Sequence, residues 1–256
     1  MSNQNIILGD CLTKLPEIDK ESVDVVVTSF PYNLKIKYNT YKDDKPRKEY
    51  LKWVEKVLVE IKRTMKLNGS FFLNIGASSS DPWLPYDMSG ILRNHFILQN
   101  TIMWVKNISI GEKSFGHFKP INSKRYLNHN FEYIFHLTNT GEVEIDRLSV
   151  GVPYTFKVNV NRWKSVKKDK RCAGDVWYIP YDTINSKKEK GKHPAIFPVA
   201  LAKKCIELHG VEDDMVVLDP MVGVGSTMVA AKQLNVNGIG IDIDEKYVDF
   251  AQKRLK

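Results

Sequence analysis

Short runs of β-branched and apolar residues alternate with helix-patterned segments along most of this chain. VDVVVTS at 23–29 and DMVVLDP at 214–220 are runs of the first kind. The segment at 48–66 instead repeats its apolar residues at helical spacing. Strands that alternate with helices predict an α/β fold with a mostly parallel, doubly wound sheet.

The pattern sets approximate limits for each element. Asn68 and Gly69 are expected to end the helix at 48–66, because glycine and asparagine commonly follow a helix C-terminus. From 140 to 192 the apolar runs are short, which predicts an irregular insertion. The expected strands are 5–10, 23–29, 70–76, 96–107, 130–139, 214–220 and 236–244, and the expected helices are 48–66, 83–95, 197–208, 226–234 and 245–256.

Length and composition limit the class of protein. The 256 residues suffice for one large α/β domain, with or without an insertion. Hydrophobic residues make up 43% and charged residues 27%, which is ordinary for a soluble protein. No apolar run is long enough to cross a bilayer, and the first residues do not resemble a secretory signal. We therefore expect a cytoplasmic protein with no membrane partner.

The cysteines argue against two kinds of site. Cys11, Cys172 and Cys205 are scattered, without a C-x-x-C pair. This spacing disfavours a disulfide framework and a zinc module, so we expect no metal. His117 and His129 also lack metal-ligand spacing.

The chain is basic, with a formal charge of +8. Such a balance suits a polyanionic partner, although many proteins without one share it. Cations mix with aromatic residues in two stretches, 35–48 and 161–171. Composition alone fits solvated loops as well as nucleic-acid contacts, so the position of these stretches must decide.

A glycine turn between a strand and a helix lies in VVLDPMVGVGSTMVAA at 216–231. Gly223 and Gly225 permit a tight turn that a ligand can approach closely, and the helix that follows presents free N–H groups. The next strand ends at Asp242, about 20 positions on, where an acid typically binds ribose hydroxyls. Met228 replaces the third glycine of G-x-G-x-x-G, which indicates a nucleoside site other than the dinucleotide type.

Several segments in one consistent order resemble the amino-group DNA methyltransferases that use S-adenosylmethionine (SAM). They read LGDCL at 8–12, SFPY at 29–32, HPAIFP at 193–198 and DPMVGVGST at 219–227. The resemblance implies a Rossmann-like SAM-dependent methyltransferase fold, with Asp10 at the adenine, Phe197 at the methionine part and Asp242 at the ribose. His193 is interpreted as a structural turn residue. The implied cofactor-binding residues are Asp10, Cys11, Phe197, Asp219, Met221, Gly223, Gly225, Ser226, Thr227 and Asp242.

The motif order is similar to the permuted β arrangement of that family, in which the target-recognition region lies between the two halves. This implies a catalytic core at 1–106, 129–139 and 193–256, and a target-recognition region at 107–128 and 140–192. The implied partner is double-stranded DNA, and a cognate restriction endonuclease would act separately; monomer and homodimer both remain open. The expected DNA-binding residues are Lys35, Lys37, Arg162, Lys164, Lys167 and Lys168.

The SFPY stretch suits methylation of an exocyclic amino group, whose lone pair is delocalised into the base. Acceptors placed around the amino group favour a geometry that can react, and the Ser29 hydroxyl and the Phe30 carbonyl are the candidates. Pro31 holds the turn, and Tyr32 offers a ring for stacking on the base. The base must leave the duplex to reach this pocket.

Two residues depart from the family pattern. Phe30 replaces a proline and Met221 replaces a phenylalanine, but neither change removes a group that the chemistry uses. Serine at position 29 is more typical of cytosine-N4 enzymes and aspartate of adenine-N6 enzymes, so we expect N4-cytosine methylation, with N6-adenine as the alternative. Cytosine-C5 methylation is disfavoured because no Pro-Cys dipeptide occurs. The more distant alternatives are a SAM enzyme acting on RNA or protein and a non-enzymatic DNA-binding protein on this fold.

Overall fold

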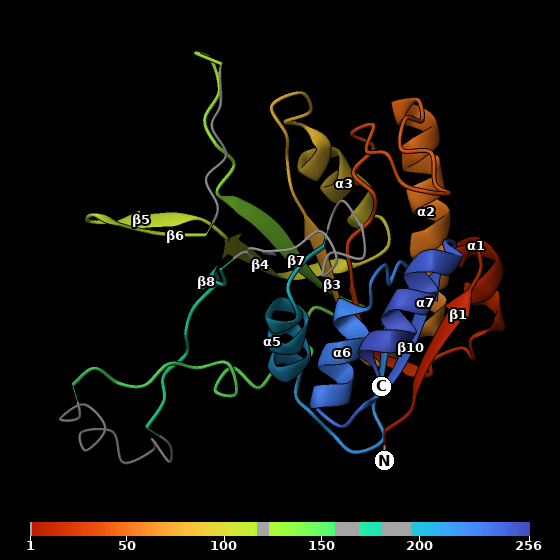
Figure 1. Ribbon diagram of the computed structural model, residues 1–256. Coiled ribbons are helices and arrows are strands. Elements are labelled where there is room, and N and C mark those ends of the chain that lie inside the picture. The colour runs from red at the N-terminus through yellow and green to blue at the C-terminus, as the bar shows by residue number, and fades with distance from the viewer. Residues whose placement is uncertain (1, 117–122, 157–168, 181–195) are drawn as a thin grey trace.

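One mixed sheet organises the molecule (Figure 1). The computed structural model describes residues 2–116, 123–156, 169–180 and 196–256, and within them this sheet has eight strands in the order β1-β10-β9-β2-β3-β7-β4-β8. Its strands are β1 (Gln4–Leu8), β2 (Val23–Thr28), β3 (Met65–Ile75), β4 (Ile97–Val105), β7 (Phe131–Thr138), β8 (Val176–Tyr178), β9 (Val216–Asp219) and β10 (Asn237–Asp242).

Strand direction decides which residues meet. The strands β1, β10, β9, β2 and β3 are parallel, β7 is antiparallel to both β3 and β4, and β8 is parallel to β4. The carboxyl ends of the parallel strands and the amino end of β7 therefore lie along one edge of the sheet, which we call the carboxyl edge.

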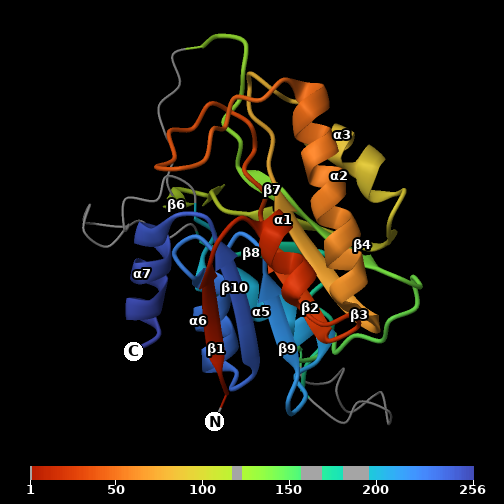
Figure 2. The same cartoon turned by 90° about the vertical axis from the view of Figure 1, so that its right-hand side faces the viewer.

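Helices cover both faces of the sheet (Figure 2). The strand β2 is buried between them: Val26 packs in the cluster formed with α1, α2 and α3, while Val25 and Val27 pack in the cluster formed with α5 and α6. No helix in the described part of the chain combines the length and apolar character needed to span a membrane. The helices are α1 (Cys11–Lys14), η1 (Leu15–Glu17, a 3-10 turn), α2 (Arg47–Thr64), α3 (Leu84–Leu92), α5 (Val199–His209), α6 (Ser226–Gln233) and α7 (Glu245–Arg254).

The expected end of the long helix is wrong. The helix α2 stops at Thr64, and Asn68 and Gly69 lie inside β3. The register between β2 and β3 shifts between Val23 and Val25. A Cβ at Gly69 would come within 3.1 Å of the Asp24 carbonyl oxygen, so glycine permits a close backbone approach at this irregularity instead of capping a helix.

The two expected target-recognition segments differ in how their described parts lie. Part of 107–128 forms a separate hairpin of β5 (Ile108–Ile110) and β6 (Lys113–Phe115), which projects from the sheet (Figure 1). Part of 140–192 joins the main sheet as β8, where the Trp104 indole N–H donates to the Ile179 carbonyl at 2.7 Å. The division into core and recognition region stays a prediction.

Candidate active site

The carboxyl edge collects the segments that the sequence singled out. Ser29 follows β2, and the glycine turn follows β9, the neighbouring strand, with Val26 paired to Leu218. The chain leaves β2 toward α2 on one face and β9 toward α6 on the other, so the edge between them is a topological switch point. Ligands of open α/β sheets bind at such points. Asp242 ends β10 and Asp10 follows β1, which places both further along the same edge.

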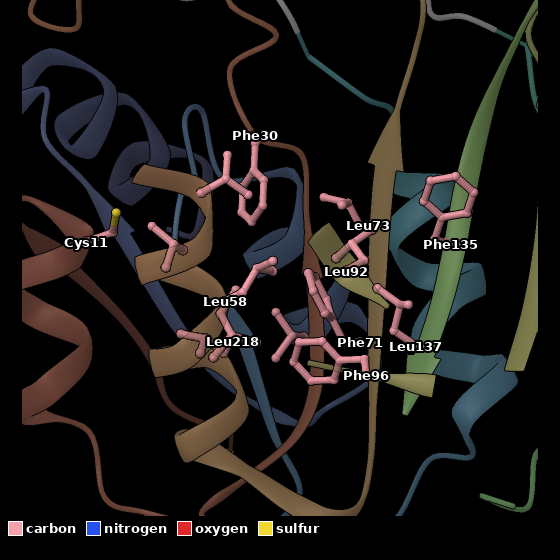
Figure 3. Packing of buried hydrophobic residues seen from close by; sticks show 14 of the residues in the cluster. Cys11, Phe30, Leu58, Phe71, Leu73, Leu92, Phe96, Phe135, Leu137 and Leu218 are labelled. Carbon is pink, nitrogen blue, oxygen red and sulfur yellow. The ribbon is translucent and has the colours of Figure 1, made fainter. Parts of the chain in front are cut away.

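The stretch Ser29–Tyr32 is anchored in the core by Phe30. That side chain is 1% exposed and meets the Trp53 ring edge-on, with 6.2 Å between ring centroids. Figure 3 shows its ring among the buried side chains of this face, near Leu58. The Pro31 carbonyl accepts a hydrogen bond from the Tyr50 hydroxyl at 2.8 Å. Phenylalanine at position 30 therefore stabilises the turn by burial.

Ser29 and Tyr32 join a polar chain that sequence reasoning missed. The Ser29 hydroxyl donates to the Tyr32 hydroxyl at 3.3 Å, and Tyr32 donates to the Glu132 carboxylate at 3.2 Å. Glu132 also pairs with Lys106 at 2.5 Å. Burial, and then the Glu132 charge, raise the pKa of the Tyr32 phenol well above its usual value, so Tyr32 stays neutral.

The glycine turn is held by the Asp219 carboxylate. This side chain is 1% exposed, and its oxygens accept from the Met221 N–H at 3.1 Å and the Thr227 hydroxyl at 2.7 Å. Burial raises the pKa of the Asp219 carboxyl to about 6. Gly225 has a φ of +85°, and a Cβ there would lie 2.9 Å from the Ala251 Cβ. The turn thus needs glycine at this position.

Asp242 and Asp10, at the ends of β10 and β1, bind different backbone N–H groups. Asp242 accepts from the Gly223 N–H and the Asp244 N–H, each at 2.8 Å, and burial raises its pKa. Asp10 caps α1 by accepting from the Leu12 N–H at 2.8 Å. Two carboxylates on neighbouring strand ends, next to a glycine turn, suit a ligand rich in hydroxyl and amino groups.

Cys11, Ser226 and Phe197 complete the predicted cofactor set within the described residues. Burial raises the pKa of the Cys11 thiol to about 12, so it presents a neutral, mostly apolar surface. Ser226 is buried and begins α6, and Phe197 precedes α5 and packs against the cluster on that face. In the described parts of the chain, no three His, Cys, Asp or Glu side chains converge on a site for a metal ion.

The family is decided by comparison with known proteins. A family model described as DNA methylase, covering N6 and N4 enzymes, matches residues 23–253. This chain belongs to that DNA methylase family.

Individual relatives agree with the family. The type II methyltransferase M.BglII of Bacillus subtilis is 30% identical over 96% of this methylase and 67% of its own length. The fold is that of solved methyltransferases. The PvuII DNA methyltransferase (cytosine-N4-specific) is 18% identical with a TM-score of 0.75, over 100% of this chain and 87% of that one. The Thermus thermophilus protein TTHA0409, in complex with SAM, is 21% identical with a TM-score of 0.65, over 99% and 93%. The predicted family and the predicted Rossmann-like fold are both confirmed.

The loop after SFPY was expected to bind DNA through Lys35 and Lys37, and both are exposed in the methylase. Asp43 organises this loop, because its buried carboxylate accepts from three backbone N–H groups of residues 33, 34 and 36 at 2.9–3.1 Å. The Thr40 hydroxyl donates to Asp244, at the start of α7, at 2.8 Å. The loop thus extends from the end of β2 to the helix that follows β10.

Some predicted residues lie outside the described part of the methylase. These are Arg162, Lys164, Lys167, Lys168 and His193. Sequence reasoning missed Glu132, although the sequence carries a signal for it. Glu132 is the one acid in the aromatic strand segment FEYIFHLT. Its partners could not be found that way, because Tyr32 and Lys106 are 100 and 26 residues distant.

Proposed function

We propose that this DNA methylase transfers a methyl group from SAM to the N4 amino group of a cytosine turned out of duplex DNA. It would act as the modification enzyme of a type II restriction–modification system, beside a separate cognate endonuclease. The observation that carries the proposal is the adjacency of β2 and β9, which sets the SFPY stretch beside the glycine turn. A base pocket and a cofactor pocket that adjoin are the basic requirement of direct methyl transfer.

The residues along the carboxyl edge fit SAM. Asp242 uses its oxygens for two backbone N–H groups, but a carboxylate has further lone pairs that ribose hydroxyls can occupy. Gly223 and Gly225 would let the backbone approach the cofactor, and Asp10 and Cys11 would contact the adenine. When bound, SAM supplies an activated methyl group on a positively charged sulphur.

The SFPY stretch would receive the base. The hydrogens of an exocyclic amino group need hydrogen-bond acceptors, and the Ser29 oxygen and the Phe30 carbonyl would provide them. Tyr32 would cover one face of the ring, where stacking stabilises the extruded base by about 1–3 kcal/mol. These interactions would hold the amino nitrogen in line with the methyl group.

A neutral serine favours N4-cytosine over N6-adenine as the target. Serine holds an amino group less firmly than the aspartate common in adenine enzymes, because hydrogen bonds to a carboxylate are stronger. Lys35, Lys37 and the basic residues of 161–171 would contact DNA phosphates, which predicts affinity that falls with salt.

One experiment tests the activity and the base together. The purified protein is incubated with methyl-labelled SAM and unmethylated DNA, and the DNA is digested to nucleosides and chromatographed. We expect label in N4-methyldeoxycytidine, and sequencing of the product would give the recognition site. Label in N6-methyldeoxyadenosine would overturn the N4 assignment and establish the alternative. Label in RNA or protein alone, or DNA binding without transfer, would overturn the proposed function.

The catalytic assignment has its own test. Ser29→Ala should reduce transfer to DNA severely, while SAM affinity measured by calorimetry stays unchanged, because the glycine turn and Asp242 are intact. Unaltered transfer by this variant would contradict the role of Ser29.

A further inference from the structure

A series of hydrogen-bonded polar side chains leads from the SFPY stretch to a partly buried ion pair. It runs from Ser29 through Tyr32 to Glu132, with oxygen–oxygen distances of 3.3 and 3.2 Å. Glu132 lies at the amino end of β7, and its other carboxylate oxygen is 2.5 Å from the Lys106 ammonium, just past β4. The side chains of Lys106 and Glu132 are only 17% and 15% exposed. Side chains from β7 and from the end of β4 therefore meet the SFPY stretch at this point.

The carboxylate fixes the direction of every hydrogen bond in this series. Ionised Glu132 has no hydrogen to donate, so the single hydroxyl hydrogen of Tyr32 must point to it. The Tyr32 oxygen can then only accept, and it accepts from the Ser29 hydroxyl. The hydrogen of Ser29 is thereby directed away, and its remaining lone pairs are left as acceptors.

Lys106 makes this arrangement specific to a carboxylate. The ammonium carries only hydrogens, so whichever atom faces it must be an acceptor. Lys106 also lies over the Trp104 ring, 5.6 Å from its centroid, which limits its freedom. On the other side, a Cβ at Gly76 would come within 2.8 Å of Glu132 Cγ, so the glycine leaves room for this side chain.

We propose that Glu132 is a positioning residue of the methyl-transfer site. Acting through Tyr32, it turns the Ser29 hydroxyl into an acceptor for the target amino group, and Lys106 holds it in place. This inference rests on the proposed function, and it applies to cytosine and adenine alike because both present an amino group that only donates. Without Glu132 the Ser29 hydrogen could face the amino group, and two donors would then oppose each other.

Glu132→Gln tests the direction of these hydrogen bonds with almost no change in side-chain shape. The amide oxygen must face Lys106, so the amide nitrogen faces Tyr32 and donates to it. Tyr32 then donates to Ser29, and the Ser29 hydrogen points at the base. We expect kcat for DNA methylation to fall about tenfold or more, a loss of the order of one unfavourable hydrogen bond. SAM affinity by calorimetry should stay close to wild type. The melting temperature should fall, because Lys106 loses its counter-charge, so kcat is measured per folded molecule.

A second substitution separates this role from a structural one. Tyr32→Phe keeps the ring but removes the hydroxyl that links Ser29 to Glu132. The Ser29 hydrogen can then turn away from the base. We expect a smaller loss of kcat in Tyr32→Phe, and we expect Glu132→Gln to cause no further loss in that background. The double variant should therefore be more active than Glu132→Gln alone. Glu21→Gln, the same charge change on an exposed turn at the opposite edge of the sheet, is the matched control.

Two results would overturn the inference. One is a kcat for Glu132→Gln equal to that of wild type, and the other is a double variant whose loss is the product of the single losses. A further readout does not need catalysis: the ¹³Cζ NMR signal of Tyr32, assigned by its absence in Tyr32→Phe. It should shift in Glu132→Gln and not in Glu21→Gln, and an unmoved signal would also overturn the inference. If the wild type methylates no DNA while the Tyr32 signal shifts as expected, the proposed function fails and the link between Glu132 and Tyr32 stands.

Discussion

Lowering the pH from 7 to 5 should destabilise this methylase through His136, a fully buried residue of β7. The Asn100 amide nitrogen, which can only donate, is 3.0 Å from His136 Nδ1, so that nitrogen must be an acceptor. Nε2–H then donates to the Ser70 hydroxyl at 3.0 Å. Ser70 in turn donates to His209 Nδ1 at 2.9 Å. A proton added to His136 would face the Asn100 amide hydrogens, so this chain requires a neutral ring.

The magnitude follows from the pKa. Burial, and then the nearby His209, lower the pKa of His136 to about 4, against about 6.5 in the unfolded chain. The folded state therefore binds the proton less readily, so the contribution of His136 is complete above pH 6.5 and is lost as the pH falls toward 4. Linkage gives a loss of about 2 kcal/mol between pH 7 and pH 5. Asp219 acts in the opposite sense, because its raised pKa adds stability as the pH falls below about 6.

Comparing wild type with His136→Gln separates the contribution of His136 to the pH dependence of stability from the contributions of Asp219 and other titrating groups. Glutamine can bond to Asn100 and Ser70 but does not titrate. Urea unfolding of both proteins at pH 7 and pH 5 should show wild type losing about 2 kcal/mol more than the variant. Equal losses in the two proteins would refute the argument that His136 is held neutral.

Three further substitutions test the site. Phe30→Ala should lower the free energy of unfolding by about 3–5 kcal/mol in urea titrations, because it empties a buried ring site. Its kcat per folded molecule should change little, since the backbone carbonyl remains. A variant as stable as wild type that loses most of its kcat would contradict both expectations. Gly225→Ala should cost about 1–3 kcal/mol, because a side chain is strained at φ +85° and meets Ala251, and a thermal melt equal to wild type would show that the turn adapts. Asp242→Asn should weaken SAM binding about tenfold or more by calorimetry, since a charged acceptor is lost; unchanged affinity would remove Asp242 from the ribose site.

The sequence predicted the segments of the site better than the links between them. SFPY and the glycine turn each follow a strongly apolar strand, so both could be placed at strand ends from local pattern alone. Their adjacency depends on the pairing of β2 with β9, which joins Val26 to Leu218 across nearly 200 residues. Glu132 lies beside Tyr32 because β7 runs antiparallel to its neighbours, and no local signal specifies that direction.

Local sequence patterns also gave wrong or incomplete predictions where tertiary contacts decide the role of a residue. Asn68-Gly69 has the composition of a helix end, yet the pair lies in β3, where the shifted register beside Val23 needs a residue without a side chain. Asp43 resembles any acid in a charged loop, but it is buried and accepts three backbone hydrogen bonds. In both cases the contact that decides the role comes from residues brought close by folding.

The pairing of β2 with β9 has a consequence for how such enzymes diversify. Neighbouring strands lie about 4.8 Å apart wherever backbone hydrogen bonds join them. The spacing between the segment that would hold the base and the segment that would hold the cofactor is thus fixed by main-chain geometry, which is nearly independent of side-chain identity. Surface segments such as the β5–β6 hairpin lie outside this strand pairing, so their length and sequence can change while the spacing between the two segments stays constant.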